Sequence, residues 1–167
     1  VLDDFSHYLL AGRLASATDV QETLQLAVDR TGIVQVRVKH RPRLLSDTGP
    51  AFIAEALADY LKPLDIQQVH GRARHPQTQG KIERYHRSMK SVVKLNTFYF
   101  PWELEQAIVD FVAYYNHERY HESLDNVTPA DVFFGRQQEV FTQREIIKQQ
   151  TLQQRRRQHL RIEEYVV

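Results

Sequence analysis

Apolar residues along the chain alternate between helical spacing and short strand-like runs. Helical spacing marks three segments, each expected to be a helix packed on a core: Thr18–Arg30, Lys81–Lys94 and Trp102–His117. Shorter helices are expected after Pro50 and between Thr128, a capping candidate, and Gly135. Strand formers predict two short strands with a tight connection in Val1–Leu14, and single strands at Ile33–Val38, Leu44–Asp47 and Leu64–Val69. This mixed order predicts a layered α/β domain, with a sheet flanked by helices.

The C-terminal end differs in pattern from the rest. From Gln138 onward the chain is rich in Gln, Arg and Glu, and apolar residues are sparse. We therefore expect residues 1–136 to form the domain and residues 137–167 to form a basic helical tail that projects or frays. Arg155, Arg156, Arg157 and Arg161 could contact a phosphate backbone, or could simply be solvated.

Length and composition narrow the class of protein. A chain of 167 residues is the size of one domain. The absence of cysteine excludes disulfides and thiolate metal sites, so any metal must be held by oxygen or imidazole. No apolar run is long enough to span a membrane and no leader is visible, so a cytoplasmic location is the expectation. Because the chain begins at Val1 inside an apolar run, we expect it to be a fragment of a longer protein.

The formal net charge of +1 conceals a strong segregation of charge. Residues 37–94 carry 12 Lys or Arg against 5 Asp or Glu, a net charge of +7, and residues 138–167 carry 6 against 4, or +2. The remaining residues carry 4 against 12, or −8. Positive charge concentrated in one region of an otherwise acidic domain favours a surface that binds a polyanion, although such clusters also occur without ligands.

The predicted helix after Gly80 has two distinct faces. Glu83, Arg87 and Lys90 fall at positions i, i+4 and i+7, which places one acidic and two basic side chains on the same face. Another face carries apolar residues suited to a core, namely Ile82, Tyr85, Met89, Val92 and Val93. The simpler interpretation is a solvated helix with internal ion pairs.

A second acid, Asp47, is expected at the end of a buried strand, where it could take part in chemistry or cap the following turn. Two carboxylates in a basic setting suit a hard divalent cation such as Mg²⁺. Two such ions, about 4 Å apart, can activate an attacking oxygen and stabilise a leaving oxygen in phosphodiester chemistry. Asp3 and Asp4 are adjacent in a predicted strand and therefore point to opposite faces, so a turn acid is the favoured role there.

His117 and His121 have a spacing that could bind a metal if both were helical. No third ligand is evident from the sequence, and Tyr120 lies between them. We favour a packing or hydrogen-bonding role for these histidines, within a cluster that also contains Tyr114, Tyr115 and Tyr120.

Four ordered segments carry a family resemblance: VLDDFSHYL, LLSDTGPAF, HPQTQGKIERYH and YNHERYHESLDNVTPADVFFG. Together they resemble the retroviral-integrase superfamily, especially bacterial insertion-sequence transposases with a DD(35)E core, and 35 residues separate Asp47 from Glu83. The resemblance runs from Val1 to about Arg136. It implies a ribonuclease-H-like mixed sheet flanked by helices, and two Mg²⁺ or Mn²⁺ ions. It also implies a water or a DNA 3′-hydroxyl as nucleophile for nicking and strand transfer.

The resemblance also implies roles for individual residues. Asp47 and Glu83 match the second and third catalytic, metal-binding acids. Gln79 matches a glutamine of the loop before the helix, and Arg87 and Lys90 match positions that contact the DNA end. Lys81 and Arg84, on the same helix, are also expected to bind DNA. Expected partners are transposon ends, target DNA and further copies of the chain, with no membrane and with nucleoid association when DNA is bound.

The first acid of the family pattern is missing from this chain. In the family it lies on the strand that precedes the one represented by VLDDFSHYL, and neither Asp3 nor Asp4 takes its place. Since a hard cation that lacks one of three carboxylates loses affinity and geometry, we expect the chain alone neither to nick nor to join DNA. The alternatives are a non-catalytic DNA-binding or assembly remnant of a transposase, and a nuclease of the ribonuclease H type.

Overall fold

A computed structural model describes residues 1–12, 20–35, 41–47, 49–53, 55–71 and 80–165. Its elements, in chain order, are α1 (Val20–Thr31), β1 (Arg43–Ser46), α2 (Pro50–Ile53), α3 (Glu55–Leu61), the 3-10 turn η2 (Lys62–Leu64), β2 (Gln67–His70), α4 (Gly80–Val93), α5 (Pro101–His117), the 3-10 turn η4 (Glu122–Leu124), α6 (Pro129–Phe133) and α7 (Gln137–Tyr165). The mixed α/β character predicted from the sequence is confirmed. Within the described ranges, no helix is both long and apolar enough to cross a membrane.

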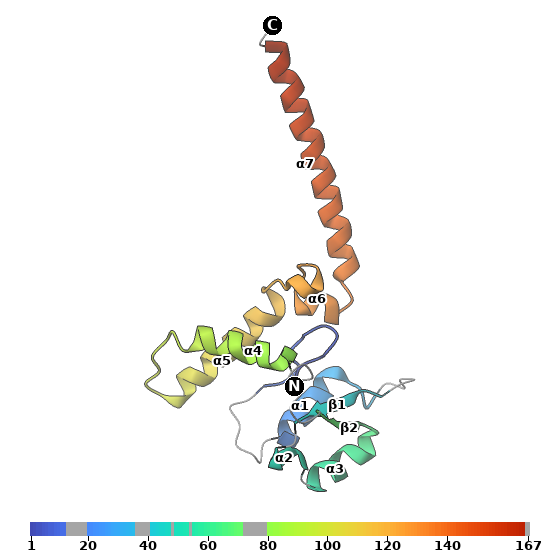
Figure 1. Cartoon of the computed structure of the whole chain (residues 1–167), viewed down its shortest axis with the longest axis vertical. Coiled ribbons are helices and arrows are strands. Elements are labelled where there is room, and N and C mark those ends of the chain that lie inside the picture. Colours follow the sequence, from blue (N-terminus) through green and yellow to red (C-terminus); the bar gives the residue numbers. More distant parts are fainter. Residues whose placement is uncertain (13–19, 36–40, 48, 54, 72–79, 166–167) are drawn as a thin grey trace.

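The sheet of the described chain consists of two parallel strands. β1 and β2 pair from Arg43 opposite Gln67 to Ser46 opposite His70, so both strands end at the same edge. α2, α3 and η2 form the connection between them, and α1 lies beside this unit (Figure 1). A cluster of Leu24, Leu57 and Leu61 joins α1 to α3 and gives this part of the molecule its core.

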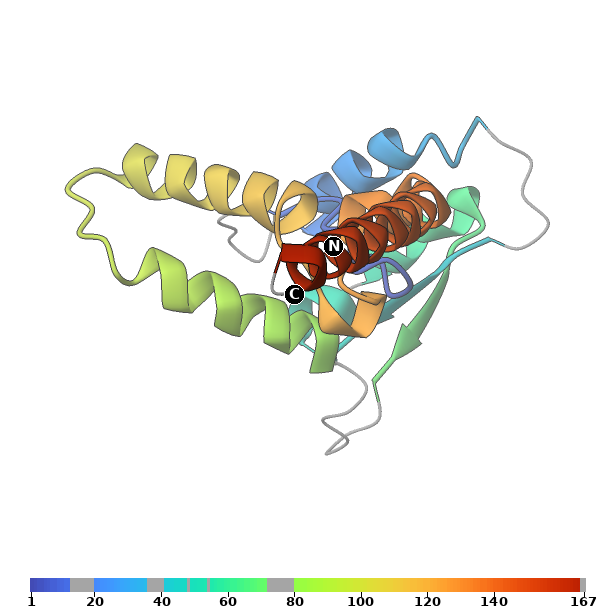
Figure 2. The same cartoon turned by 90° about the horizontal axis from the view of Figure 1, so that it is seen from above.

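A second core holds the N-terminal segment against the α4–α5 pair. Leu9, Tyr85, Phe111 and Tyr115 are buried together. α4 and α5 lie side by side and are joined by residues 94–100, as both views show (Figures 1 and 2). The carboxylate Oε2 of Glu103 closes the start of α5 by accepting hydrogen bonds from the backbone N–H groups of Tyr99 (2.8 Å) and Phe100 (3.1 Å).

The short helix α6 begins and ends as predicted. The Thr128 hydroxyl accepts from the Asp131 backbone N–H at 3.2 Å and donates to the Asp131 carboxylate at 2.8 Å. Gly135 follows with a φ of 72°, a left-handed conformation that favours glycine. After it, α7 packs Val140 and Phe141 on a small third core and then projects from the molecule (Figure 1), which confirms the expected helix.

Two strand predictions were wrong where the structure describes the chain. In the N-terminal segment, a single antiparallel bridge between Leu2 and Leu9 replaces the two strands. Asp3 explains the difference, because its carboxylate accepts from the Ser6 backbone N–H at 2.7 Å and turns the chain between them. This is the turn-acid role favoured from the sequence.

The strand predicted at 33–38 is also not formed over residues 33–35, and the rest of that prediction lies outside the described residues. Gly32 ends α1 with a φ of 60°, and the Gln35 backbone N–H donates to the Gly32 carbonyl at 2.9 Å. The left-handed glycine therefore starts a turn immediately after the helix, before a strand can begin.

Candidate functional site

The acidic residue predicted at the end of β1 is exposed at the sheet edge. Asp47 follows Ser46, the last residue of β1, and its Oδ1 accepts a hydrogen bond from the Gly49 backbone N–H at 3.0 Å. Asp47 therefore makes the turn contact that the sequence offered as the simpler role. An added Cβ at Gly49 would lie 3.0 Å from the same Oδ1, so the absence of a side chain there leaves room for the carboxylate.

Two side chains of β2 fix the residue before Asp47. Gln68 Nε2 donates to the Ser46 hydroxyl at 3.0 Å and to the Phe52 carbonyl at 2.8 Å. His70 Nδ1 lies 3.2 Å from the Asp47 carbonyl and 3.3 Å from the Ser46 hydroxyl. The sequence did not mark either residue, because their role depends on the parallel register that places His70 opposite Ser46.

α4 presents the second predicted acid and two predicted cations to solvent. Glu83 lies in the first turn, and Glu83, Arg87 and Lys90 are all exposed. Tyr85 is turned inward and buried, and burial raises the pKa of its phenol to about 12. The two faces predicted from the spacing are thus present, with Ile82 and Met89 packed on the core beside Tyr85.

The remaining predicted DNA-binding residues divide into three cases. Lys81 is paired with Asp4, with 2.9 Å between Lys81 Nζ and Asp4 Oδ1, and both side chains are largely exposed. Arg84 lines a pocket together with residues from other parts of the chain. Gln79 lies outside the described residues.

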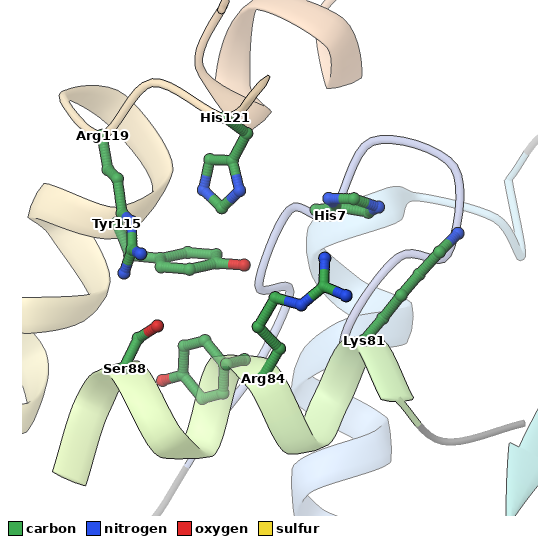
Figure 3. Close-up of a pocket in the computed structure, with 8 residues that line it drawn as sticks. His7, Lys81, Arg84, Ser88, Tyr115, Arg119 and His121 are labelled. Atoms are coloured by element: carbon green, nitrogen blue, oxygen red, sulfur yellow. The ribbon is translucent and has the colours of Figure 1, made fainter. Parts of the chain in front are cut away.

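This pocket lies between α4, the end of α5 and the N-terminal turn (Figure 3). We call it the basic pocket and define it by five of its lining residues, His7, Arg84, Tyr115, Arg119 and His121. In Figure 3, Arg84 lies near the hydroxyl end of Tyr115 and Arg119 lies at the other end of that side chain. Lys81 lies at its margin. The pocket joins positions distant in sequence. The sequence had marked Lys81 and Arg84 as DNA-binding residues and Tyr115 and His121 as members of an aromatic and imidazole cluster, but not their proximity.

His121 is set in the basic pocket by the chain that follows α5. The Glu118 and Arg119 N–H groups both donate to the Tyr114 carbonyl at 2.9 Å, which ends the helix. His121 then pairs with Val127 in an isolated bridge. Because the helix stops before His121, the i,i+4 spacing with His117 does not bring the two imidazoles onto one helix face.

Ring contacts confirm the packing role favoured for these two histidines. His121 lies edge-on to Tyr115 with 4.9 Å between ring centroids, and His117 contacts Tyr8 at 6.1 Å. Burial lowers the pKa of His121 to about 4, and the nearby Arg119 acts in the same direction. The His121 ring is therefore neutral at pH 7.

The donor chemistry of Asp47 and Glu83 fits a hard divalent cation, since both are exposed carboxylates. Within the described part of the chain, no group of three or more His, Cys, Asp or Glu residues is arranged to hold a metal ion. The Asp3 carboxylate accepts a hydrogen bond from Ser6, and the Asp4 carboxylate forms an ion pair with Lys81. Neither contact involves a residue at the end of β1 or β2.

Comparison with known proteins agrees with this architecture. The model of the integrase core domain family matches residues 64–129, which include Glu83. The Pol polyprotein of equine infectious anemia virus (strain Wyoming) is 29% identical over 109 residues, which cover 64% of this chain and 9% of that protein. A retrovirus-related Pol polyprotein from the Drosophila melanogaster transposon opus is 30% identical over 149 residues, covering 83% of this chain and 13% of that protein. The chain thus spans a small part of the relatives it matches.

Solved structures show the same fold at lower identity. The catalytic core domain of BIV integrase superposes with a TM-score of 0.55 and 22% identity, covering 84% of this chain and 86% of that one. A simian T-cell lymphotropic virus intasome in complex with the PP2A regulatory subunit B56 gamma gives a TM-score of 0.62 and 17% identity, covering 78% and 45%. The ribonuclease-H-like integrase-core fold predicted from the sequence is confirmed. The match to the integrase core domain family and the similarity to Pol polyproteins support membership of the retroviral integrase superfamily.

Proposed function

We propose that this chain is a DNA-binding part of a catalytic core that acts in DNA integration or transposition by metal-dependent nicking and strand transfer, and that the chain by itself is inactive. The observation that carries the proposal is the exposed face of α4, where the acid Glu83 and the cations Arg87 and Lys90 stand together in an integrase-core fold. Its relatives include the Pol polyprotein of equine infectious anemia virus and a retrovirus-related Pol polyprotein from a transposon. Residues 1–136 would form the core and residues 137–167 the basic tail.

In this proposal the cations hold DNA and the carboxylates hold metal. Arg87 and Lys90 project from α4 as exposed cations that neutralise backbone phosphates, which gives affinity independent of sequence. Asp47 and Glu83 would hold Mg²⁺ or Mn²⁺, which supplies charge stabilisation for phosphodiester cleavage and transfer. Gln79 would add a contact from the loop before α4.

DNA ends and target DNA are the proposed partners, together with further copies of the chain. Both substrates are polyanions, which agrees with the +7 charge of residues 37–94. Joining two DNA ends to a target requires more than one active site, so a homo-oligomer is part of the proposal. A cytoplasmic location, with nucleoid association when DNA is bound, also remains a proposal.

Manganese binding tests the assignment of the two acids. Mn²⁺ is titrated into the purified chain and free Mn²⁺ is followed by electron paramagnetic resonance. We expect Asp47→Asn and Glu83→Gln each to weaken binding at least about tenfold, since each removes one of two charged oxygen donors. Asp59→Asn, which changes an exposed carboxylate of α3, is the matched control and should bind like the parent chain. Equal Mn²⁺ affinity in all four proteins would refute the assignment.

A further inference from the structure

The basic pocket is an unbalanced cluster of positive charge. Arg84, Arg119 and the marginal Lys81 line it, and no carboxylate is among its lining residues. Lys81 is already neutralised by Asp4. Among the described residues, neither guanidinium has a recorded ion pair with a carboxylate, and Arg119 lies over the Tyr115 ring at 5.7 Å from its centroid. The pocket therefore presents two guanidinium groups that have no anionic partner in the described part of the chain.

His121 carries a polar atom that has no hydrogen-bond partner among the described residues. Its Nε2 is buried and unpaired within the described structure. Leaving a buried polar atom unpaired costs about 1–3 kcal/mol, so a group that bonds this nitrogen would gain stability from doing so. Figure 3 shows the His121 ring directed into the space between Tyr115 and His7, which makes this nitrogen a candidate donor to a bound group.

His7 enters the basic pocket from a strained backbone. Its φ of 60° is left-handed, a conformation that costs a non-glycine residue about 1–3 kcal/mol. The turn that imposes it is held by the His7 backbone N–H donating to the Asp3 carbonyl at 2.9 Å. The ring then lies 5.9 Å from the His121 ring, centroid to centroid. The strain thus places a second imidazole against the same space.

The chemistry of these groups selects the ligand. Two guanidinium groups repel a metal cation and offer planar sets of N–H donors that match the oxygens of a phosphate. Neutral imidazoles and the Tyr115 hydroxyl can add uncharged hydrogen bonds. The cavity measures about 40 Å³ and is therefore larger than the minimum for one water, about 10–15 Å³.

We propose that the basic pocket binds one phosphate group through Arg84, Arg119 and His121. The phosphate could be free inorganic phosphate or one phosphate of a DNA backbone. The DNA case rests on the proposed function, because Arg84 follows Glu83 directly in α4 and would hold a backbone phosphate near that acid. The free-phosphate case does not depend on it.

Phosphate titration tests the proposal directly. Inorganic phosphate is added to the full chain at constant ionic strength, with chloride as the matched anion, and the imidazole signals of His7 and His121 are followed by NMR. We expect saturable shifts with phosphate but not with chloride. Arg84→Gln and Arg119→Gln should each weaken binding at least about tenfold, as the loss of a charge-assisted hydrogen bond predicts. Arg43→Gln, an exposed arginine of β1 outside the pocket, should leave binding unchanged.

Identical shifts with phosphate and chloride in the parent chain would overturn the proposal, whatever the folding of the variants. Phosphate binding that survives both pocket substitutions would also overturn it. A second arm uses a short DNA duplex. If DNA supplies the phosphate, inorganic phosphate competes with DNA more strongly than chloride does. Replacing Arg84 and Arg119 together with Gln then also reduces the salt dependence of DNA affinity. If phosphate binds but DNA does not, the pocket stands as a free-phosphate site and the proposed function fails. If DNA binds but phosphate leaves both histidines unchanged, only the pocket proposal fails.

Discussion

Asn116 joins the N-terminal segment to α5 through two buried hydrogen bonds, and its removal should destabilise the whole fold. Its Oδ1 accepts from the Leu9 backbone N–H at 2.9 Å, and its Nδ2 donates to the Leu9 carbonyl at 3.1 Å. The exposed fractions are 3% for Asn116 and 2% for Leu9, so water cannot replace either bond. An asparagine is suited to this position because its amide both donates and accepts.

The magnitude follows from the groups that lose their partners. Asn116→Ala leaves one N–H and one carbonyl buried and unpaired, each at a cost of about 1–3 kcal/mol, so we expect the free energy of unfolding to fall by about 2–5 kcal/mol. That is a large fraction of the roughly 5–15 kcal/mol of stability typical of a domain. Asn116→Asp should cost more at neutral pH, because it buries a charge and turns an acceptor toward the Leu9 carbonyl.

Urea denaturation followed by circular dichroism measures this effect. With a slope of about 2 kcal/mol per molar urea, the midpoint should fall by about 1–2.5 M in Asn116→Ala at unchanged slope. Asn96→Ala, at an exposed position after α4, should remain within about 0.5 kcal/mol of the parent chain. A loss below about 0.5 kcal/mol in Asn116→Ala would show that the Leu9 contacts do not fasten the N-terminal segment.

Three further predictions concern acidity, the end of β1 and catalysis. Burial lowers the pKa of His121 from 6.5 to about 4 and also lowers the pKa of His7. Because the unfolded chain then binds protons at a higher pH than the folded chain does, the free energy of unfolding is fully present above about pH 6.5 and falls as the pH drops toward 4. Because His121 is only partly buried, we expect its share to be about 1–2 kcal/mol, removed in His121→Gln and measurable by denaturation at pH 7 and pH 4.5. Gly49→Ala should weaken Mn²⁺ binding several-fold with the fold intact, since its Cβ would displace the Asp47 carboxylate; an unchanged affinity would contradict that placement. Plasmid nicking in Mn²⁺ should be absent for this chain. If the chain does nick and Asp47→Asn abolishes the nicking, that prediction is contradicted and Asp3 or Asp4 becomes the candidate for the first catalytic acid.

Local sequence signals predicted the helices well, because each carries its own signal. The spacing of Leu24, Ala27 and Val28 indicated α1, and these residues are buried on one face. Thr128 and Gly135 marked both ends of the α6 turn through capping chemistry that depends on a few neighbouring residues. Strands were predicted less well, since Gly32 and Asp3 impose turns that the apolar pattern of the flanking residues does not reveal.

The candidate site residues also differ in how well the sequence predicted them. Glu83, Arg87 and Lys90 were found from spacing, since their common face follows from the helix alone. The basic pocket was not, because Arg84 and His121 meet only when α5 folds back on α4 and ends before His121. Tertiary contacts bring two arginines and two histidines together, and no single stretch of sequence predicts those contacts.

The central claim is that the exposed face of α4 binds DNA, and the salt dependence of DNA affinity tests it most directly. Fluorescence anisotropy with a labelled duplex at several salt concentrations gives the slope of log affinity against log salt. We predict that replacing Arg87 and Lys90 together with Ala reduces this slope by about two, one for each lost phosphate contact. The matched control replaces Arg43 and Lys62, also exposed, and should keep the parent slope. A slope unchanged by the Arg87 and Lys90 substitutions would contradict the account.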